Sequence, residues 1–375
     1  SVLSAVGFLL GLYVAWRLFW PLRMPIWMKV VLSLLLVSVA VQLRIVAMFW
    51  GTMASPEIPK LAIASLATGS TAVLLLALFL LVLDAGLLVS RILRRPRAVS
   101  ALRAPKLRPA AGVLALLVSG YGVSQGMAVP KPRQIEVSIA GLPAAFDGYR
   151  VLQLSDIHAS RLLTGDWVRR VVDDSNALKP DLIVITGDLI DGSVEARRED
   201  ARPLADLHAP DGVIAITGNH EYYTQYQPWI EHFNSLGLRL LLNEHSIIEQ
   251  GDAAFALAGI TDKSAAVHGQ PMPDVTAAVA GIPAGMPIIM LAHRPDTAKD
   301  SAAAGAALQL SGHTHGGHIV GMHKIVQMAN DGYVGGLYQV GDMQLYVSYG
   351  AGLWAGFPLR LGRASEITLI TLRAS

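Results

Sequence analysis

The sequence predicts two parts of different fold class: an N-terminal all-α transmembrane bundle over residues 1–129, and an α/β domain over residues 130–375. Apolar runs dominate the first third of the chain, and charged residues become more frequent after Pro130. From there, apolar β-branched runs alternate with helical patterns. Overall 53% of residues are hydrophobic and 15% are charged, whereas soluble domains carry about 25% charged residues. Part of the chain is therefore expected to lie in lipid.

Four apolar stretches cover residues 2–16, 28–50, 61–90 and 110–129. A membrane-spanning helix needs ~20 mostly apolar residues, so the second, third and fourth are long enough. The first is marginal and spans only if residues 17–20 serve as its interfacial end. It lacks a preceding basic region and a clear cleavage site, so we expect a retained helix rather than a signal peptide. The sequence thus predicts about four spans.

The loops predict the orientation of these helices. Seven basic residues lie between Arg91 and Arg108, whereas the loop before the third stretch offers only Lys60. Basic loops stay in the cytoplasm. The α/β domain is therefore expected on the outer, periplasmic face of the cytoplasmic (inner) membrane, at the end of a multi-pass anchor. Asp84 lies inside the third stretch, where we expect Arg91 or interfacial water to satisfy it.

Composition narrows the classes of function. With no cysteine, the chain has neither disulfides nor thiolate ligands nor a cysteine nucleophile. The net charge of +2 is too small to indicate nucleic acid as a partner. The sequence leaves the oligomeric state open.

The second part reads as alternating strands and helices. A helix is expected over residues 165–178, with Thr164 as its cap. Strands are expected over residues 134–139, 149–154, 182–186, 213–217, 254–258, 287–292, 307–311, 344–348 and 366–372. This alternation predicts a largely buried parallel sheet with helices on its faces.

Five of these strands end in side chains that can bind metals or protons. In chain order these side chains are Asp156 and His158, Asp188, Asn219 and His220, His293, and His313 and His315. In open α/β sheets ligands bind beyond the carboxyl ends of the strands, so these groups should meet in one crevice. Each motif alone is weak, because a lone Gly-Asp or Asn-His pair is usually a turn. Five in order are much stronger.

The residue types indicate a metal centre. Carboxylate and imidazole without thiolate suit Mn²⁺, Fe²⁺ or Zn²⁺. Two such ions can clamp the attacking and leaving oxygens of an in-line displacement. A carboxylate that bridges two ions must be held rigidly, and Asp188, directly after Gly187, is the natural candidate. His313 and His315 alternate along an extended segment, so they face the same side.

The ordered motifs closely resemble those of the calcineurin-like metallophosphoesterase family. They are Asp156-Ile157-His158, Gly187-Asp188, Gly218-Asn219-His220-Glu221, His293 and Gly312-His313-Thr314-His315. The resemblance covers residues 148–373 and is greatest to the membrane-associated branch, in which two glycines follow the last motif. It implies an α/β sandwich with helices packed on the β-sheets. His318 stands where that branch often has glutamine, and we expect it at the rim of the site.

The resemblance implies a role for each of these side chains. Asp156, His158 and His315 would hold one divalent ion, and Asn219, His293 and His313 the other. Asp188 would bridge the two ions together with a hydroxide that attacks phosphorus. His220 would protonate the leaving oxygen or stabilise its charge; the alternative is that it only supports Asn219 and Asp188. Glu221 is expected to be a structural partner rather than a base.

These features predict a binuclear metallophosphoesterase that cleaves a phosphate ester or pyrophosphate bond. We expect a phosphorylated envelope lipid or lipid-linked substrate, with manganese among the usable metals and phosphodiesters among the usable esters. Two interpretations stay open for the aromatic residues in segments 222–233 and 353–357: a rim that contacts the bilayer, or ordinary packing over the sheet, which we expect for each residue taken singly. Two alternatives stay open: a cytoplasm-facing pyrophosphatase of a nucleotide-linked lipid precursor, and a non-enzymatic membrane receptor or scaffold.

Overall fold

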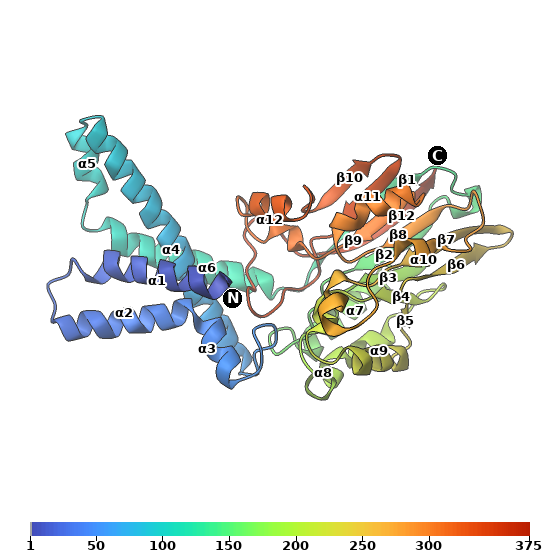
Figure 1. Ribbon diagram of the computed structural model, residues 1–375, viewed down its shortest axis with the longest axis horizontal. Coiled ribbons are helices and arrows are strands. Elements are labelled where there is room, and N and C mark those ends of the chain that lie inside the picture. The colour runs from blue at the N-terminus through green and yellow to red at the C-terminus, as the bar shows by residue number, and fades with distance from the viewer. Residues whose placement is uncertain (1) are drawn as a thin grey trace. The chain divides into compact units, whose positions relative to one another are not determined.

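A computed structural model describes residues 2–375 (Figure 1). The chain divides into two compact units. The first holds the chain as far as Gln125 together with Gly356–Leu359, and the second holds Gly126–Ala355 and Arg360–Ser375.

The first unit is all-helical. Its helices are α1 (Val2–Phe19), α2 (Ile26–Ala40), α3 (Gln42–Phe49), α4 (Lys60–Ile92), α5 (Pro96–Leu102) and α6 (Leu107–Gly126). Two of them, α4 and α6, are long and apolar enough to cross a membrane. Val14 of α1 and Leu76 and Leu80 of α4 form the buried core of this unit. The N-terminal bundle of apolar helices is thus confirmed.

The second predicted span, residues 28–50, differs from the expectation of one straight helix. It consists of α2 and α3, which are bent by 73° relative to each other. The break falls at Val41, where the backbone leaves helical dihedral angles, and the polar side chain of Gln42 directly after it is buried. The described chain has two helices that can span, or three if the bent pair forms one span, and α1 is a shorter apolar helix.

Asp84 finds a partner that the sequence did not predict. Its carboxylate accepts hydrogen bonds from the Tyr13 hydroxyl at 2.7 Å and from Arg17 Nε at 2.9 Å. The guanidinium of Arg17 also forms an ion pair with it. The expected partner, Arg91, is wrong: the pair joins α1 to α4 inside the bundle. An intramembrane charge is costly unless it is paired, and this contact satisfies it.

The second unit contains two six-stranded sheets. The first has the order β1-β12-β2-β3-β4-β5 and the second β10-β11-β9-β8-β7-β6. Strands of the first sheet are β1 (Lys131–Ile139), β2 (Arg150–Leu154), β3 (Leu182–Thr186), β4 (Val213–Ile216), β5 (Arg239–Leu240) and β12 (Glu366–Ala374). Strands of the second are β6 (Glu244–Gln250), β7 (Ala253–Gly259), β8 (Ile288–Leu291), β9 (Leu308–Ser311), β10 (Gly336–Val340) and β11 (Met343–Val347).

Alternation alone predicted one parallel sheet, and this is wrong. The chain forms two mixed sheets, in which β12–β2, β6–β7 and β10–β11 are antiparallel pairs. Strands β5, β6 and β10 were not predicted, since β5 has only two residues and the other two lie at sheet edges with many exposed side chains. The α/β sandwich that the resemblance implied is confirmed.

The two sheets pack face to face around an apolar layer. Val184 and Ile370 of the first sheet share this layer with Phe255 and Leu310 of the second. Helices cover both outer faces, as Figure 1 shows: α7 (Gly165–Ala177), α8 (Val194–Ala201) and α9 (Tyr226–Ser235) belong to the first face, and α10 (Val275–Val279) and α11 (Ala298–Ala303) to the second. Thr164 occupies the N-cap position of α7, although its side chain makes no capping hydrogen bond.

Burial contradicts most of the possible aromatic rim and confirms the packing expected for the single residues. Tyr222, Trp229 and Phe233 are at most 1% exposed, and they pack in the core over the outer face of the first sheet. Of that segment's large aromatic residues, Tyr223 is the exposed one, at 47%. Aromatic side chains at helical spacing were therefore core residues here, because they cover a sheet.

Candidate metal centre

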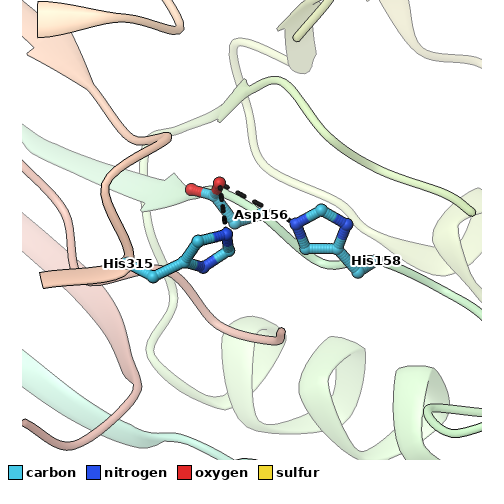
Figure 2. A group of neighbouring side chains, drawn as sticks. All are labelled: Asp156, His158 and His315. Atoms are coloured by element: carbon cyan, nitrogen blue, oxygen red, sulfur yellow. Dashed lines mark ion pairs between the residues drawn. The ribbon is translucent and has the colours of Figure 1, made fainter. Parts of the chain in front are cut away.

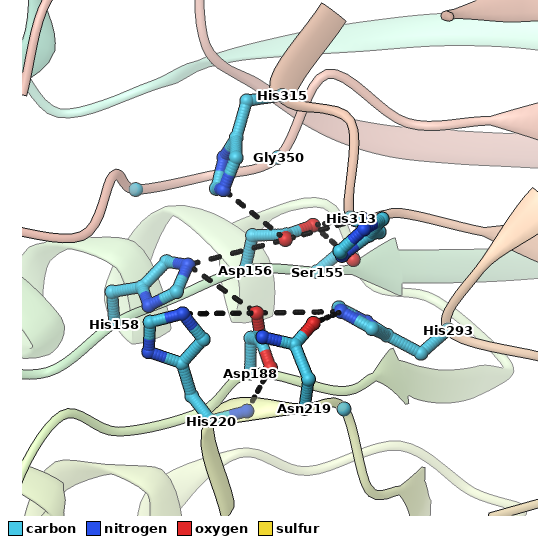
Figure 3. A network of polar contacts seen from close by, with 12 residues as sticks. Ser155, Asp156, His158, Asp188, Asn219, His220, His293, His313, His315 and Gly350 are labelled. Carbon is cyan, nitrogen blue, oxygen red and sulfur yellow. Dashed lines mark hydrogen bonds and ion pairs between the residues drawn. The ribbon is translucent and has the colours of Figure 1, made fainter. Parts of the chain in front are cut away.

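The carboxyl ends of five strands bring eight polar side chains together, as Figure 3 shows. Three of these strands belong to the first sheet and two to the second. Strand β2 supplies Asp156 and His158, β3 supplies Asp188, β4 supplies Asn219 and His220, β8 supplies His293, and β9 supplies His313 and His315. The site therefore lies where both sheets end, which is why neither sheet alone contains it.

One cluster contains Asp156, His158 and His315 (Figure 2). Oδ1 of Asp156 lies 3.6 Å from Nε2 of His315 and 4.0 Å from Nε2 of His158. That nitrogen of His158 is buried and has no hydrogen-bond partner anywhere in residues 2–375. An unpaired buried nitrogen beside carboxylates is costly, and a metal ion would satisfy it.

A second cluster contains Asp188, His293 and His313. Nε2 of His293 lies 3.3 Å from Oδ2 of Asp188 and 3.1 Å from Oδ1 of Asn219. On its other side, Nδ1 of His293 donates to the carbonyl of Thr186 at 2.8 Å. A carbonyl only accepts, so Nδ1 carries the hydrogen and Nε2 faces the cluster, the orientation that a metal-binding histidine needs.

Asp188 stands between the two clusters. Its Oδ2 lies 3.6 Å from His158 Nε2 and 3.3 Å from His293 Nε2, which belong to different clusters. Its Oδ1 accepts a hydrogen bond from the backbone N–H of His220 at 2.8 Å. Behind it, the buried carboxylate of Glu221 accepts from the N–H groups of Asp188 and Leu189. Glu221 is therefore a structural partner, as predicted.

The backbone is strained where these side chains are held. Five of the eight residues have positive φ, between 48° and 68°. They are Asp156, His158, Asp188, His313 and His315. Such conformations cost about 1–3 kcal/mol each and persist only where the surrounding structure enforces them, typically at functional sites.

Two glycines allow the loops to approach this closely. A Cβ on Gly312 would lie 1.9 Å from Ser155 Oγ and 2.4 Å from Asp156 Oδ2. A Cβ on Gly187, which has φ +90°, would lie 2.5 Å from the backbone nitrogen of Gly218. Both positions require glycine because a neighbouring ligand or its loop occupies the space of the side chain.

Burial and neighbouring charges strongly affect the pKa values of the site residues, often in opposite directions. Burial raises the pKa of the Asp156 carboxyl, and the neighbouring Asp188 adds to the rise. Burial would also raise the pKa of Asp188, but the imidazoles of His293 and His220 hold it well below its usual range. Burial lowers the pKa of His313 well below its usual value. Buried carboxylates and imidazoles without thiolate are donors that suit divalent cations, so this set fits a metal centre.

His220 lies beside the clusters rather than inside one. Its Nδ1 contacts Oδ1 of Asp191 at 2.5 Å, and its Nε2 lies 3.9 Å from Oδ2 of Asp188. Burial would lower the pKa of His220, but the carboxylates of Asp188 and Asp191 outweigh it and raise the pKa to about 9. Tyr223 and Trp354 flank the ring, with centroids 4.8 and 6.2 Å away. His220 is therefore held as an imidazolium at neutral pH by these two carboxylates.

Comparison with known proteins agrees with this geometry. The family model of calcineurin-like phosphoesterases matches residues 149–317. A transmembrane protein with a metallophosphoesterase domain from Danio rerio is 35% identical over 70% of this chain, and the chain spans 62% of that relative's length. The metallophosphoesterase YkuE of Bacillus subtilis is 31% identical over 68% of this chain and 91% of its own length.

The chain belongs to the metallophosphoesterase family. The metallophosphoesterase is therefore a phosphoric ester hydrolase, and its family uses divalent metal ions. A further relative, from Bos taurus, is also described as a transmembrane protein with a metallophosphoesterase domain, 34% identical over 75% of this chain and 67% of its own length. Together with the apolar helices α4 and α6, this indicates a membrane protein. Among solved structures, the NAD nucleotidase of Haemophilus influenzae has a TM-score of 0.39 and is 13% identical over 55% of this chain and 45% of its own length. So distant a likeness carries no argument about the substrate.

The sequence missed Asp191, which the metallophosphoesterase places at the centre of a third histidine–carboxylate group. A single oxygen, Oδ1, faces Nδ1 of His158 at 3.2 Å and Nδ1 of His220 at 2.5 Å. The only signal was its position three residues after Asp188 in the same turn. A lone acidic residue in a turn is common, so the contact between distant loops was needed to identify it.

Two arginines beside the site were also missed. Arg294 donates from Nη1 to Nε2 of His313 at 2.8 Å, and its Nε donates to Asp262 at 2.7 Å. Arg360 is buried and donates to the backbone carbonyls of His315 at 2.8 Å and Tyr349 at 2.6 Å. Neither belongs to a motif with a spacing signal.

His318 departs from its expected position at the rim. It is only 9% exposed, and its ring centroid lies 5.1 Å from that of His315. Two positive-φ glycines, Gly316 and Gly317, turn the chain inward before it. The turn packs the imidazole against the site instead of leaving it in solvent.

Proposed function

We propose that this metallophosphoesterase hydrolyses a phosphate ester or pyrophosphate bond of an envelope lipid or lipid-linked substrate. The observation that carries the proposal is a buried, histidine-rich carboxylate centre in a chain that also has helices able to span a membrane. A membrane anchor keeps a site near lipid head groups and so raises its effective concentration for them. We further propose residues 1–129 as the anchor and residues 130–375 as the hydrolase. About four membrane crossings would require both the bent α2–α3 pair and the shorter helix α1 to span.

The proposed ligands divide between two divalent ions. Asp156, His158 and His315 hold one ion, and the orphaned Nε2 of His158 supports this assignment. Asn219, His293 and His313 hold the other, which fits the outward Nε2 of His293. Asp188 bridges, because its Oδ2 lies near the histidines of both sets. Bound there, the cations would lower the pKa of water and neutralise charge on the phosphoryl oxygens.

His220 serves as the general acid in this proposal. The imidazole must carry a proton at neutral pH and must reach the leaving oxygen. A pKa of about 9 supports the first requirement. The position of its Nε2, 3.9 Å from Oδ2 of the proposed bridging Asp188, supports the second. The contact with Asp191 holds Nδ1, so Nε2 is the nitrogen that donates.

Arg294 is proposed to contact the phosphoryl group of the substrate. Its guanidinium is held by Asp262 and lies beside His313, at the edge of the second cluster. A planar guanidinium matches two oxygens of a phosphate. In the absence of substrate its Nη1 donates to His313, and phosphate oxygens offer a charged replacement for that acceptor.

An apolar segment next to the site supports a lipid as substrate. Helix α12 (His323–Ala329) has no buried residue. Val320, Ile325 and Met328 are 62%, 64% and 76% exposed. This segment begins two residues after His318, which packs against His315. Exposed apolar side chains close to a metal centre suit contact with acyl chains. The outer, periplasmic face is proposed from the basic loop of residues 91–108.

The test uses purified full-length protein with manganese, a total envelope-lipid extract in detergent, and phosphorus NMR. Loss of one lipid resonance is expected with the wild type and with His208→Ala, an exposed histidine outside the site. His220→Ala should leave that resonance unchanged for at least ten times longer, because a general acid contributes about 10²–10⁴-fold.

A soluble nucleotide-linked substrate hydrolysed while every lipid resonance persists would contradict the proposed substrate. A reporter fused after Ser375 tests the side of the membrane. Activity of the reporter only in the cytoplasm would contradict the proposed outer location.

A further inference from the structure

The turn between α4 and α5 borders an open, basic surface cavity that hydrolysis does not use. Its volume is about 930 Å³, and four arginines line it: Arg91, Arg94, Arg95 and Arg103. The hydroxyl-bearing Ser90 and Ser100 also line it. All of these residues belong to the segment 90–105, so the cavity contains none of the metal-centre residues.

The arginines of the cavity lack acidic partners. The segment 91–108 contains seven basic residues and no Asp or Glu. None of the four arginines forms an ion pair with any of residues 2–375. Basic residues that keep a loop in the cytoplasm only need to lie in that loop. Such a role does not require them to surround one cavity. Four guanidinium groups around a common space repel one another unless an anion lies between them.

The backbone of the turn is shaped to present these side chains. Helix α4 ends in a Schellman motif, in which the N–H of Arg95 bonds to the carbonyl of Ser90 at 2.8 Å and the N–H of Arg94 bonds to that of Arg91 at 3.0 Å. Arg94 occupies the left-handed position with φ 51°. Glycine is the usual residue there, because it has no Cβ to strain the backbone. Arg94 therefore adopts a strained backbone conformation, and in this conformation its side chain lines the cavity.

Apolar residues beside the cavity indicate the kind of anion. Leu88, Val89, Ile92 and Leu93 are 53–69% exposed. They lie on the last turns of a 33-residue helix, which is roughly 50 Å long at 1.5 Å per residue and so exceeds a hydrocarbon core of about 30 Å. When α4 spans the bilayer, its C-terminal turn can therefore reach beyond the hydrocarbon core, which would bring the arginines to the head groups with apolar surface directly next to them.

We propose that this cavity binds the phosphate of an anionic phospholipid, whose acyl chains lie along the exposed residues of α4. Basic pockets beside membrane helices bind such head groups through charge-assisted hydrogen bonds, and arginine suits phosphate through its planar fork of donors. The bound lipid would fix the α4–α5 turn at the membrane surface. The proposal concerns a site separate from the metal centre, so its test does not depend on hydrolysis.

The experiment counts bound lipid on delipidated full-length protein in detergent by native mass spectrometry. The probes are dioctanoyl phosphatidylglycerol, dioctanoyl phosphatidylcholine and inorganic phosphate. Arg94→Gly removes one guanidinium and also relieves the left-handed strain, so it should fold at least as well as the wild type. Arg97→Ala is the matched control, because it removes the same charge from the same loop outside the cavity lining.

One saturable phosphatidylglycerol is expected on the wild type and on Arg97→Ala. Arg94→Gly should bind it about fivefold more weakly, the factor that corresponds to ~1 kcal/mol per basic residue at an anionic membrane. Equal binding by Arg94→Gly and Arg97→Ala would overturn the site, as would equal binding of phosphatidylcholine. Inorganic phosphate binding as tightly as the lipid would support the anion site and overturn the lipid as its source.

Discussion

Replacing Asp191 with asparagine should test the proposed acid chemistry more directly than removing any metal ligand. Oδ1 of Asp191 lies 2.5 Å from Nδ1 of His220 and 3.2 Å from Nδ1 of His158. Asparagine keeps the shape of the side chain and removes its negative charge. The proton on His220 should therefore become easier to lose, while the surrounding packing stays the same.

The size of the effect follows from the pKa of His220. The carboxylates of Asp188 and Asp191 together raise it from the usual 6.5 to about 9. Asp191→Asn removes one of these two charges, so the pKa of His220 should fall. A complete return to 6.5 would reduce the protonated fraction at pH 7.5 from roughly 97% to roughly 9%. We therefore expect kcat at that pH to fall, by about tenfold at most.

The sign of the pH dependence distinguishes this role from a structural one. The protonated imidazole is the active form, so activity is present below the pKa and lost as the pH rises through it. The alkaline limb of the kcat profile should move from near pH 9 in the wild type toward pH 6.5 in Asp191→Asn. Most of the lost activity should return at pH 6.

The assay is hydrolysis of a chromogenic phosphodiester by full-length protein from pH 5.5 to 10, with saturating manganese and with metal content measured for each variant. Asp252→Asn, an exposed substitution of the same type in the β6–β7 turn, is the control. A uniform loss of kcat at every pH, with the alkaline limb unmoved, would refute the reasoning. Asp191 would then act only by orienting His158.

Three further outcomes are expected. Calorimetry with manganese at pH 7.5, in buffers of different ionisation enthalpy, should detect release of about one proton from His293. Asp188 raises the pKa of His293 to about 10 against the opposing effect of burial, and a metal ligand must lose that proton. No release of a proton would contradict the assignment of His293 as a ligand. Arg360→Met should lower the free energy of unfolding by about 3 kcal/mol or more, because buried carbonyls lose their donor, whereas the exposed Arg170→Met should change it by less than about 0.5 kcal/mol in guanidinium titrations. Asp84→Leu and Arg17→Leu should each lower the melting temperature in detergent, because a single change leaves one unpaired charge in the bundle. The double variant should recover part of the loss, whereas additive losses would argue against the pair.

Several features were predictable because local sequence decides them. The strands before Asp156, Asp188 and His293 are short and largely apolar, and each of these side chains lies two residues beyond the end of its strand. The carboxyl ends of strands that run in one direction meet at one edge, so order along the chain already indicated one crevice. Uninterrupted apolar length likewise predicted α4 and α6.

Other features could not be predicted, because they depend on residues far apart in the chain. Asp84 pairs with Arg17, 67 residues away, rather than with the nearby Arg91. Asp191 gains its role from two histidines, of which the nearer is 29 residues away. The bend at Val41 falls where the polar Gln42 interrupts the apolar run, but one polar residue does not by itself end a helix, and only the packing that buries Gln42 shows the break.

By itself, therefore, the sequence determined the family, the α/β class and the chemical types gathered at the strand ends, since these follow from short motifs and from apolar periodicity. Only the tertiary structure decided that two mixed sheets, rather than one parallel sheet, surround the centre. It also decided that Asp191 and Arg294 stand beside the proposed ligands and that four arginines share one cavity. The physical reason is that local patterns specify which element forms and which side chain ends it. The contacts between ends depend on how whole elements pack, and packing joins residues that no spacing in the sequence connects.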